Sequence, residues 1–306
     1  MSSRRPFLVS RTAKIDARVV VIAAVYWKSF AGSRIINTST VAKRAAFRDL
    51  HRQGCFILPN PWDVGSARYL ETLGFQALAS TSSGFAWSHG YADSAMPLEA
   101  VLTHLEMITA ATGLPLNADF EHGFADTPEG VAANVARACK TGIAGLSIED
   151  TTKGVATPLF SIEDAVVRMR AARSAIDATG GDVLLVGRAD GLFAGRDNMD
   201  EILARLRAYA DAGADVLYAP GLTTEDQVSA VVRAVAPKPV NVLATPDFTV
   251  ERLAALGVRR ISVGGALARA AWAGFMSAAQ EMAKSGSFKE FTRAASGREL
   301  NALMKS

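Results

Sequence analysis

Residues 115–123 read PLNADFEHG, and this stretch decides the fold more clearly than any other part of the chain. An apolar run leads straight into Asn117 and Asp119, and Glu121 follows two residues later. Residues two apart on a β-strand share one face. We therefore expect Asn117 and Asp119 to point the same way at the carboxyl end of a buried strand, with Glu121 in the loop that follows.

A second apolar run ends in the same way, because residues 145–150 read GLSIED and place Glu149 at a strand end. Two strands that deliver carboxylate oxygens to one end of a sheet resemble a magnesium site, since Mg²⁺ prefers oxygen ligands. Helix capping or an ion pair with a nearby arginine is the alternative for any single acid of this kind.

Short apolar runs alternate with amphipathic helical segments eight times from about Thr40 onward. Nearly continuous apolar runs are typical of parallel strands that are buried on both faces. The expected strands are Cys55–Pro59, Ala77–Ser82, Leu114–Asp119, Gly145–Glu149, Val183–Asp190, Asp215–Ala219, Val240–Thr245 and Arg260–Gly264. Eight such units predict an α/β fold, a (β/α)₈ TIM barrel. An open doubly wound sheet is the runner-up, but residues 60–63 (NPWD) are not the glycine-rich turn that it usually carries.

Helix starts are also visible in the sequence. Thr127 followed by Pro128 indicates a capped start, and Cys139 falls on the apolar stripe of that helix. Its place on that stripe predicts that Cys139 is a core residue.

Ser161, three residues before Asp164, resembles a capping box with Asp in place of Glu.

The composition is that of an ordinary globular protein, since 49% of the 306 residues are hydrophobic and 21% are charged. Seven basic residues and one acid lie in residues 1–40, which leaves the remainder mildly acidic although the net charge is +3. We predict a basic, non-catalytic N-terminal extension over residues 1–42, with disorder or a targeting peptide as alternatives, and a catalytic domain with C-terminal helices over residues 43–306. The acidic body argues against a nucleic-acid partner. Only two cysteines and no apolar run near the ~20 residues that span a bilayer favour a cytoplasmic protein without a membrane partner.

Polar residues gather where the expected strands end, which is where a barrel carries its active site. Chance explains one such residue more easily than a series of them. The series comprises Asn60, Asp63, Thr81, Ser82, Ser83, Asp93, Asp119, Glu149, Arg188, Asp190 and Thr245. We assign Asn60, Asp63 and Asn117 to substrate binding on this placement.

Five of these segments, in this order, resemble the isocitrate lyase / phosphoenolpyruvate mutase superfamily over about residues 45–285. They are NPWDVGSAR at 60–68, TSSG at 81–84 with GYAD at 90–93, NAD at 117–119, IED at 148–150 and GRAD at 187–190. The resemblance implies a barrel whose last helix is swapped between subunits, assembly into dimers or tetramers, and a Mg²⁺ cofactor, with Mn²⁺ as an alternative. It also implies small α-keto or hydroxy carboxylates as substrates and the making or breaking of C–C or P–C bonds.

The resemblance further implies roles for individual positions. Asp93, Asp119 and Glu149 match the acids that hold Mg²⁺, directly or through water. Arg188 matches the arginine that binds the substrate carboxylate, although an ion pair with Asp190 or Glu149 is the alternative. The loop that holds carboxylate or phosphonate oxygens is matched by Thr81, Ser82 and Ser83.

Two departures from the family pattern bear on mechanism. Asn117 replaces the first Asp of an Asp-Ala-Asp pair, and we expect Glu121 to restore the lost charge. Residues 151–160 contain neither the Cys nor the His of the isocitrate lyase loop. The mutase and phosphonopyruvate hydrolase loops carry a Lys followed by an Asn or Thr, and only Lys153 and Thr157 can stand in for these. His122, with His89 as a weaker candidate, then becomes the expected proton donor, which makes Arg188, Glu121 and His122 the predicted catalytic residues.

Taken together, these features predict a Mg²⁺-dependent homo-oligomeric lyase. Its reaction is C–C cleavage of a small α-keto acid or 2-hydroxy dicarboxylate, resembling oxaloacetate decarboxylase or methylisocitrate lyase. One alternative is P–C chemistry of the phosphonomutase, phosphonopyruvate hydrolase or carboxyphosphonoenolpyruvate mutase type. The other is a non-catalytic keto-acid binder.

Overall fold

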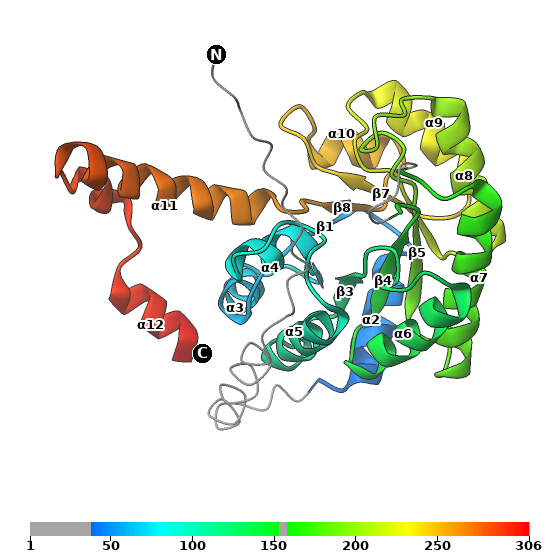
Figure 1. The fold of residues 1–306 in the computed structure, drawn as a ribbon, viewed down its shortest axis with the longest axis horizontal. Helices are drawn as coiled ribbons and strands as arrows, with labels where there is room; N and C mark the ends of the chain where they lie inside the picture. Colours follow the sequence, from blue (N-terminus) through cyan, green and yellow to red (C-terminus); the bar gives the residue numbers. More distant parts are fainter. Residues whose placement is uncertain (1–37, 153–157, 306) are drawn as a thin grey trace, which may run out of the picture. The chain divides into compact units, whose positions relative to one another are not determined.

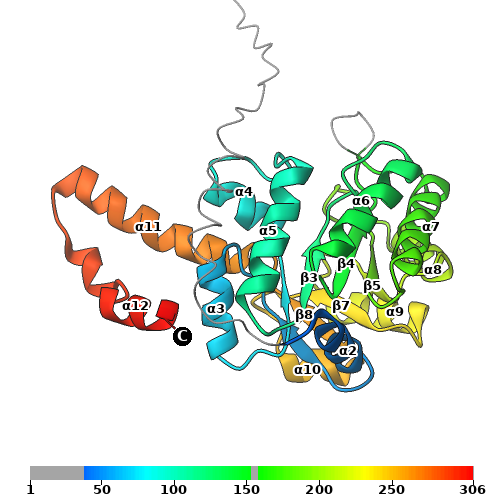
Figure 2. The ribbon, with the colours of Figure 1, turned by 90° about the horizontal axis from the view of Figure 1, so that it is seen from below.

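Eight parallel strands form the centre of the domain that the structure describes (Figures 1 and 2). The computed structural model describes residues 38–152 and 158–305. The strands are β1 (Phe56–Leu58), β2 (Leu78–Ala79), β3 (Leu116–Asp119), β4 (Gly145–Glu149), β5 (Leu184–Arg188), β6 (Val216–Tyr218), β7 (Val240–Leu243) and β8 (Arg260–Ser262). Their order in the sheet is β1-β8-β7-β6-β5-β4-β3-β2, with every pair parallel.

The two ends of this sheet, β1 and β2, are joined by hydrogen bonds beyond the regular ladder. Ala79 N donates to Pro59 O at 3.0 Å, and the side chain of Asn60 spans the same seam. The sheet is therefore a closed barrel, which confirms the predicted (β/α)₈ fold and excludes the open doubly wound sheet.

Helices surround the strands, and most of them pack against the helix that comes before or after them in the chain. They are α2 (Thr40–Leu50), α3 (Val64–Thr72), α4 (Ser82–Ser88), α5 (Leu98–Ala111), α6 (Pro128–Lys140), α7 (Ile162–Ala178), α8 (Met199–Asp211), α9 (Glu225–Val235), α10 (Val250–Ala255), α11 (Ala266–Ser285), the 3₁₀ helix η1 (Lys289–Arg293) and α12 (Gly297–Lys305). None of the helices in the described ranges is both long and apolar enough to cross a bilayer.

Capping side chains start the helices where the sequence predicted. Thr127 Oγ1 accepts the N–H of Gly130 at the start of α6, and Ser161 Oγ accepts the N–H of Asp164 at the start of α7. Each cap satisfies a backbone donor that the first turn of a helix leaves without a partner. Both predicted helix starts are confirmed.

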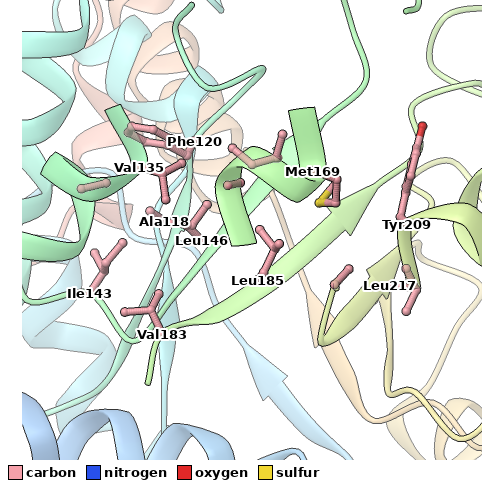
Figure 3. Packing of buried hydrophobic residues seen from close by; sticks show 14 of the residues in the cluster. Ala118, Phe120, Val135, Ile143, Leu146, Met169, Val183, Leu185, Tyr209 and Leu217 are labelled. Atoms are coloured by element: carbon pink, nitrogen blue, oxygen red, sulfur yellow. The ribbon is translucent and has the colours of Figure 1, made fainter. Parts of the chain in front are cut away.

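The main core lies between the outer faces of the strands and the surrounding helices. Figure 3 shows Val135 of α6, Met169 of α7 and Leu146 of β4 within this one cluster. Cys139 is buried in the same cluster, as its place on the apolar stripe predicted.

Helix α2 closes the amino-terminal end of the barrel. Phe47 is fully buried in a cluster that includes Phe56 at the start of β1 and Leu184 at the start of β5. Lys43 Nζ donates to the carbonyls of Thr109 and Thr112. At the same end, a Cβ added to Gly145 would lie 2.8 Å from the Phe47 ring, so β4 needs a glycine at this position. The mouth at the opposite, carboxyl-terminal end of the strands is left for function.

Several predicted boundaries differ from the structure. The strand expected over Ala77–Ser82 ends at Ala79, because Thr81 caps α4 and Ser82 begins that helix. The domain boundary predicted at residue 43 falls inside α2, which begins at Thr40, and the division into domains stays a prediction. The rest of the predicted extension lies in residues 1–37, outside the described residues, and stays a prediction.

The last long helix does not pack along the barrel as its predecessors do. Among the 20 residues of α11, only Ala268 is buried, and the helix runs away from the strands in both views (Figures 1 and 2). α12 then packs against α3, and Arg68 Nη1 donates to Met304 O. The predicted exchange of this helix between subunits stays a prediction.

Candidate active site

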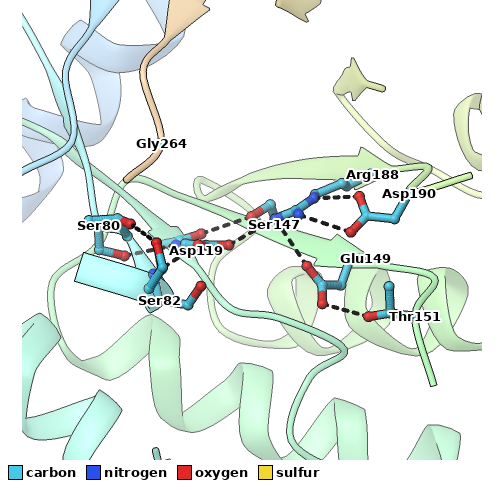
Figure 4. Close-up of polar contacts among 12 residues, drawn as sticks. Ser80, Ser82, Asp119, Ser147, Glu149, Thr151, Arg188, Asp190 and Gly264 are labelled. Carbon is cyan, nitrogen blue, oxygen red and sulfur yellow. Dashed lines mark hydrogen bonds and ion pairs between the residues drawn. The ribbon is translucent and has the colours of Figure 1, made fainter. Parts of the chain in front are cut away.

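Three carboxylates surround one guanidinium at the carboxyl end of the strands (Figure 4). Arg188 donates through Nε to Asp190 Oδ1 at 2.6 Å and through Nη2 to Asp190 Oδ2 at 2.9 Å. Its Nη1 lies 3.0 Å from Glu149 Oε2 and 3.3 Å from Asp119 Oδ1. The ion pair that the sequence left as an alternative for Arg188 is therefore present.

Strand register explains why these side chains meet. β3, β4 and β5 are neighbours, and Glu149 is paired directly with Arg188. Asp119 pairs with Ser147, two residues before Glu149 on the same face of β4. The last residues of three adjacent strands therefore point into one mouth.

Negative charge at this centre exceeds what the single guanidinium offsets. Burial raises the pKa of Glu149 to about 8; Arg188 opposes the shift, and the negative charges of Asp190 and Asp119 add to it. Burial also raises the pKa of Asp190. Although burial acts to lower the pKa of Arg188, the three carboxylates hold that pKa above its ordinary value. A centre of this kind attracts a further cation.

The donor set fits Mg²⁺ in its chemistry, because Asp119 and Glu149 offer hard carboxylate oxygens where negative charge is in excess. The predicted set of three acids is not assembled, however. Asp93 is exposed, and its Oδ1 accepts the N–H of Ser94. Within residues 38–152 and 158–305, no three His, Cys, Asp or Glu side chains are grouped to hold a metal ion. The metal assignments stay predictions.

The residues after β2 lie beside Asp119, as the sequence predicted. Ser82 N donates to Asp119 Oδ2 at 3.0 Å, and Asp119 N donates to Ser80 Oγ at 2.8 Å. Thr81 Oγ1 lies 3.1 Å from Ser83 Oγ and also caps α4. The structure therefore brings Thr81, Ser82 and Ser83 to the centre, together with Ser80, which the sequence did not single out.

The side chains of Asn60 and Asp63 form hydrogen bonds with backbone groups in this structure. Asn60 Nδ2 donates to Ser80 O, and its Oδ1 accepts the N–H groups of Val263 and Gly264, each at 2.9 Å. Asp63 is exposed and forms a capping box with Ser66 at the start of α3. The structure therefore accounts for both side chains without a substrate.

Asn117 lies one layer deeper in the barrel than Asp119. Its Oδ1 accepts a hydrogen bond from Arg260 Nη1 at 3.2 Å, and Arg260 Nε donates to Asn241 Oδ1 at 2.9 Å. Arg260 is buried, and burial lowers its pKa to about 9. The structure thus places Asn117 with a buried guanidinium, away from the group of acids that meets at Arg188.

A second buried hydrogen-bond network, centred on Asp150, holds the backbone of Asp190. Asp150 Oδ1 accepts the N–H of Asp190 at 2.8 Å, while its Oδ2 accepts from Tyr209 Oη at 2.6 Å and pairs with Arg205 Nη1 at 3.1 Å. The sequence placed Asp150 at a strand end but did not identify its two helical partners. Charged and polar residues on the buried face of α8 were the available signal.

Glu121 and His122 occupy the loop after β3 and are both buried. Glu121 O accepts the N–H of Glu149 at 3.0 Å, so the loop is joined directly to the centre. His89 is exposed at the end of α4. Lys153 and Thr157 lie in residues 153–157, outside the described part of the chain. The proton-transfer roles of these residues stay predictions.

Comparison with known proteins places the site in a family context. The family model described as phosphoenolpyruvate phosphomutase matches residues 47–283. The 2-methylisocitrate lyase of Escherichia coli is 33% identical over 170 residues, which cover 53% of this chain and 56% of that protein. The oxaloacetate decarboxylase of Paraburkholderia xenovorans is 29% identical over 202 residues, covering 62% and 64%. The chain thus spans less than two thirds of the length of these curated relatives.

Solved structures match over nearly their whole length. A crystal structure from Burkholderia cenocepacia described as a "putative lyase/mutase" is 45% identical, with a TM-score of 0.85, and the match covers 87% of this chain and 98% of that one. A second from the same organism, described as a "putative phosphonomutase", is 36% identical with a TM-score of 0.73, covering 81% and 100%.

Proposed function

Because the chain belongs to the phosphoenolpyruvate phosphomutase family, we propose that it is a Mg²⁺-dependent lyase that cleaves a C–C bond of a small α-keto acid or 2-hydroxy dicarboxylate. Oxaloacetate is the first candidate substrate. The relatives named for such reactions, a 2-methylisocitrate lyase and an oxaloacetate decarboxylase, support this choice.

One observation carries the proposal, namely the meeting of Asp119, Glu149 and Asp190 around Arg188 at the barrel mouth. Two of these acids end strands and can hold a cation, and the guanidinium lies between them. Cleavage beside a keto group needs little more, because a cation stabilises the charge that develops on the carbonyl oxygen. Bound at Asp119 and Glu149, Mg²⁺ would act as a Lewis acid on the substrate oxygens.

The chain's own residues would bind and orient the substrate. Asp190 accepts from Nε and Nη2 of Arg188, whereas Nη1 is paired with Glu149 and Asp119. We assign Nη1 to the substrate carboxylate when a cation takes over the oxygens of Glu149 and Asp119. Ser82 N–H orients Asp119 through its Oδ2. When the C3–C4 bond of oxaloacetate breaks, CO₂ leaves, the electron pair stays on the substrate, and a proton added at C3 gives pyruvate.

The test is a substrate panel with matched variants. Purified protein with Mg²⁺ is offered oxaloacetate, methylisocitrate, a dimethylmalate-type acid and phosphonopyruvate, while pyruvate and phosphate release are followed. Because free Mg²⁺ itself promotes decarboxylation of oxaloacetate, each rate is referred to that of Asp119→Asn protein at the same metal concentration. Glu163→Gln, exposed in the first turn of α7, serves as the control for a lost negative charge. Pyruvate release that is equal in wild type and Asp119→Asn refutes the proposal.

P–C chemistry is the second candidate, favoured by the 36% identity to the structure described as a phosphonomutase and by the description of the matching family. Phosphate release from phosphonopyruvate, or its conversion to a phosphate ester, would establish it. Oxalate-induced thermal stabilisation without turnover of any compound would instead establish a non-catalytic binder.

We also propose that the enzyme is a homo-oligomer in which a second copy covers α11. This helix and the segment after it expose large apolar side chains that a folded chain rarely leaves in water. They are Leu267, Trp272, Phe275, Met276, Met282, Phe288 and Phe291. A second copy supplies the same apolar residues in return, which is how symmetric dimers bury such surfaces.

A further inference from the structure

The β3–α6 loop, residues 120–126, has an unusual backbone. Glu121 has a φ of 45° and Phe124 has a φ of 53°, both in the left-handed region that non-glycine residues rarely adopt. Such conformations persist only where the surroundings hold them, and they occur most often at functional sites. The contacts that hold this loop therefore indicate what it is for.

Every backbone carbonyl from residue 121 to residue 126 accepts a hydrogen bond from outside the loop. Glu149 N donates to the first of them. Asn134 Nδ2, on α6, donates to the carbonyls of residues 123 and 124 at 3.0 Å each. Arg168, on α7, donates through Nη2 to residues 122 and 125 at 2.7 and 2.6 Å, and through Nη1 to residue 126 at 3.0 Å. Two side chains thus account for five of the six carbonyls.

Arg168 is an unusual residue for a purely structural position. Its side chain is buried on the apolar face of α7, and it makes no ion pair with any residue that the structure describes. Its guanidinium lies 4.2 Å from the centroid of the Phe160 ring, so the loop carbonyls and one aromatic face provide its surroundings. Burial lowers the pKa of Arg168, and the nearby Asp126 and Asp164 only partly oppose the shift. Burying a charge without a carboxylate costs free energy, and fixing the loop is what this guanidinium achieves.

The loop and its clamp connect directly to the centre. Glu121 O holds the N–H of Glu149, whose Oε2 lies 3.0 Å from Arg188 Nη1. Phe160, beneath the guanidinium of Arg168, is held in turn by Asp150, since Phe160 N donates to Asp150 O at 2.9 Å. Movement of the loop would therefore shift Glu149 as well as Glu121 and His122, which lie in the loop itself.

We propose that Arg168 and Asn134 are positioning residues that hold the β3–α6 loop in one conformation, so that Glu121, His122 and Glu149 are placed for the reaction. The proposal rests on the proposed function for its catalytic half. Neither residue touches the reacting atoms. Both act through backbone carbonyls, and a point charge can replace only part of what a guanidinium that bridges three carbonyls does.

The experiment compares full-length wild type with Arg168→Met, Arg168→Lys, Asn134→Ala and the exposed control Arg170→Met. Hydrogen exchange by mass spectrometry is followed in peptides that cover residues 118–130, with α9 peptides as the internal reference. Kinetics are measured on the substrate that the panel identifies. Oxalate binding with Mg²⁺ is measured by calorimetry.

We expect the loop peptides of Arg168→Met to exchange about tenfold faster while the α9 peptides are unchanged. We also expect kcat to fall by about 10²-fold, with KM altered far less, because small displacements of catalytic groups cost that much. Arg168→Lys should recover part of the loss. Asn134→Ala, which removes only two of the bonds, should show a weaker form of both effects and remains informative if Arg168→Met does not fold.

Loop exchange and kcat in Asn134→Ala and Arg168→Lys that equal those of Arg170→Met would overturn the proposal. A fall in kcat that accompanies faster exchange throughout the barrel would also overturn it, since that pattern reports general destabilisation. If wild type turns over nothing, the proposed function fails. Faster loop exchange and weaker oxalate binding in the same variants would still support the clamp, and their absence would refute it.

Discussion

Replacing Asn60 by Leu tests whether the seam of the barrel depends on one side chain. Asn60 makes three hydrogen bonds to backbone across the ends of β1, β2 and β8, and it is only 5% exposed. Leu has nearly the same size but no polar atom. Its introduction leaves two N–H groups and one carbonyl buried without partners, each at a cost of about 1–2 kcal/mol. We therefore expect the free energy of unfolding to fall by about 3–6 kcal/mol.

Asn60→Asp provides the matched variant. A carboxylate can still accept from the N–H groups of Val263 and Gly264, but it faces the carbonyl of Ser80 instead of donating to it. We expect a smaller loss, about 1–3 kcal/mol near neutral pH. The loss should shrink as the pH falls, because a protonated carboxyl can again donate to that carbonyl.

The assay is urea unfolding followed by far-UV circular dichroism and tryptophan fluorescence, with steady-state kinetics on the same samples. The sequence interpretation of Asn60 as a substrate ligand predicts the opposite pattern, a stable protein with a raised KM. Stability of Asn60→Leu within about 1 kcal/mol of wild type, the usual spread for harmless substitutions, would refute the seam argument.

Three further predictions concern His104, helix α11 and Gly145. Burial lowers the pKa of His104 from 6.5 to about 3, so the unfolded chain binds the proton more tightly, and stability is lost as the pH falls from about 6.5 toward 3. Between pH 6 and pH 4, the free energy of unfolding should therefore fall less steeply in His104→Phe than in wild type. We expect the two slopes to differ by about 1.4 kcal/mol per pH unit. Replacing both Trp272 and Phe275 on α11 by Glu should lower the mass measured by light scattering to that of one chain, and an unchanged mass would argue against the proposed oligomer. Gly145→Ala places a Cβ 2.8 Å from Asn117 Oδ1 and should lower the free energy of unfolding by about 1–3 kcal/mol in urea, whereas a neutral result would show that the barrel floor can shift.

The positions of all eight strands could be predicted from the sequence, and their lengths could not. Strands that are buried on both faces must be nearly continuous apolar runs, so each run marks a strand. Strand ends depend on local competition that hydrophobicity does not report. Thr81 shows this, because its hydroxyl caps α4 and ends β2 earlier than the apolar run suggests.

The acids and the arginine of the centre could also be predicted, because strand ends in a barrel converge on one mouth. The contacts that short polar side chains make at this mouth could not be predicted. Asn60 spans the seam and Asp63 caps α3, contacts that their positions at strand ends did not reveal; their assignment to substrate stays a prediction. Capping, bridging and ligand binding use the same residue types at strand ends, so spacing does not separate them.

The supporting helical residues were missed for a different reason, namely that they lie far in sequence from what they hold. A signal did exist for Arg168. It falls on the apolar face of α7 that Ala165, Met169 and Ala172 define, where a charged residue needs a reason. Arg205 has the same relation to the buried face of α8. A charge inside an apolar stripe points to a buried polar contact even when its partner is unknown.

The contact between Asn117 and Arg260 offers a reason why position 117 carries an amide instead of the aspartate of the family pattern. An aspartate there would meet Arg260 at the distance where Asn117 now accepts a hydrogen bond, 3.2 Å, and would neutralise it. The amide leaves the positive charge of Arg260 in place one layer beneath Asp119. The barrel interior then holds two guanidiniums, of Arg188 and Arg260, against the carboxylates of Asp119, Glu149 and Asp190. An additional aspartate at position 117 would make the net charge of that set more negative. The amide at position 117 and the buried guanidinium of Arg260 therefore act together, because both keep the layer beneath Asp119 from becoming negative.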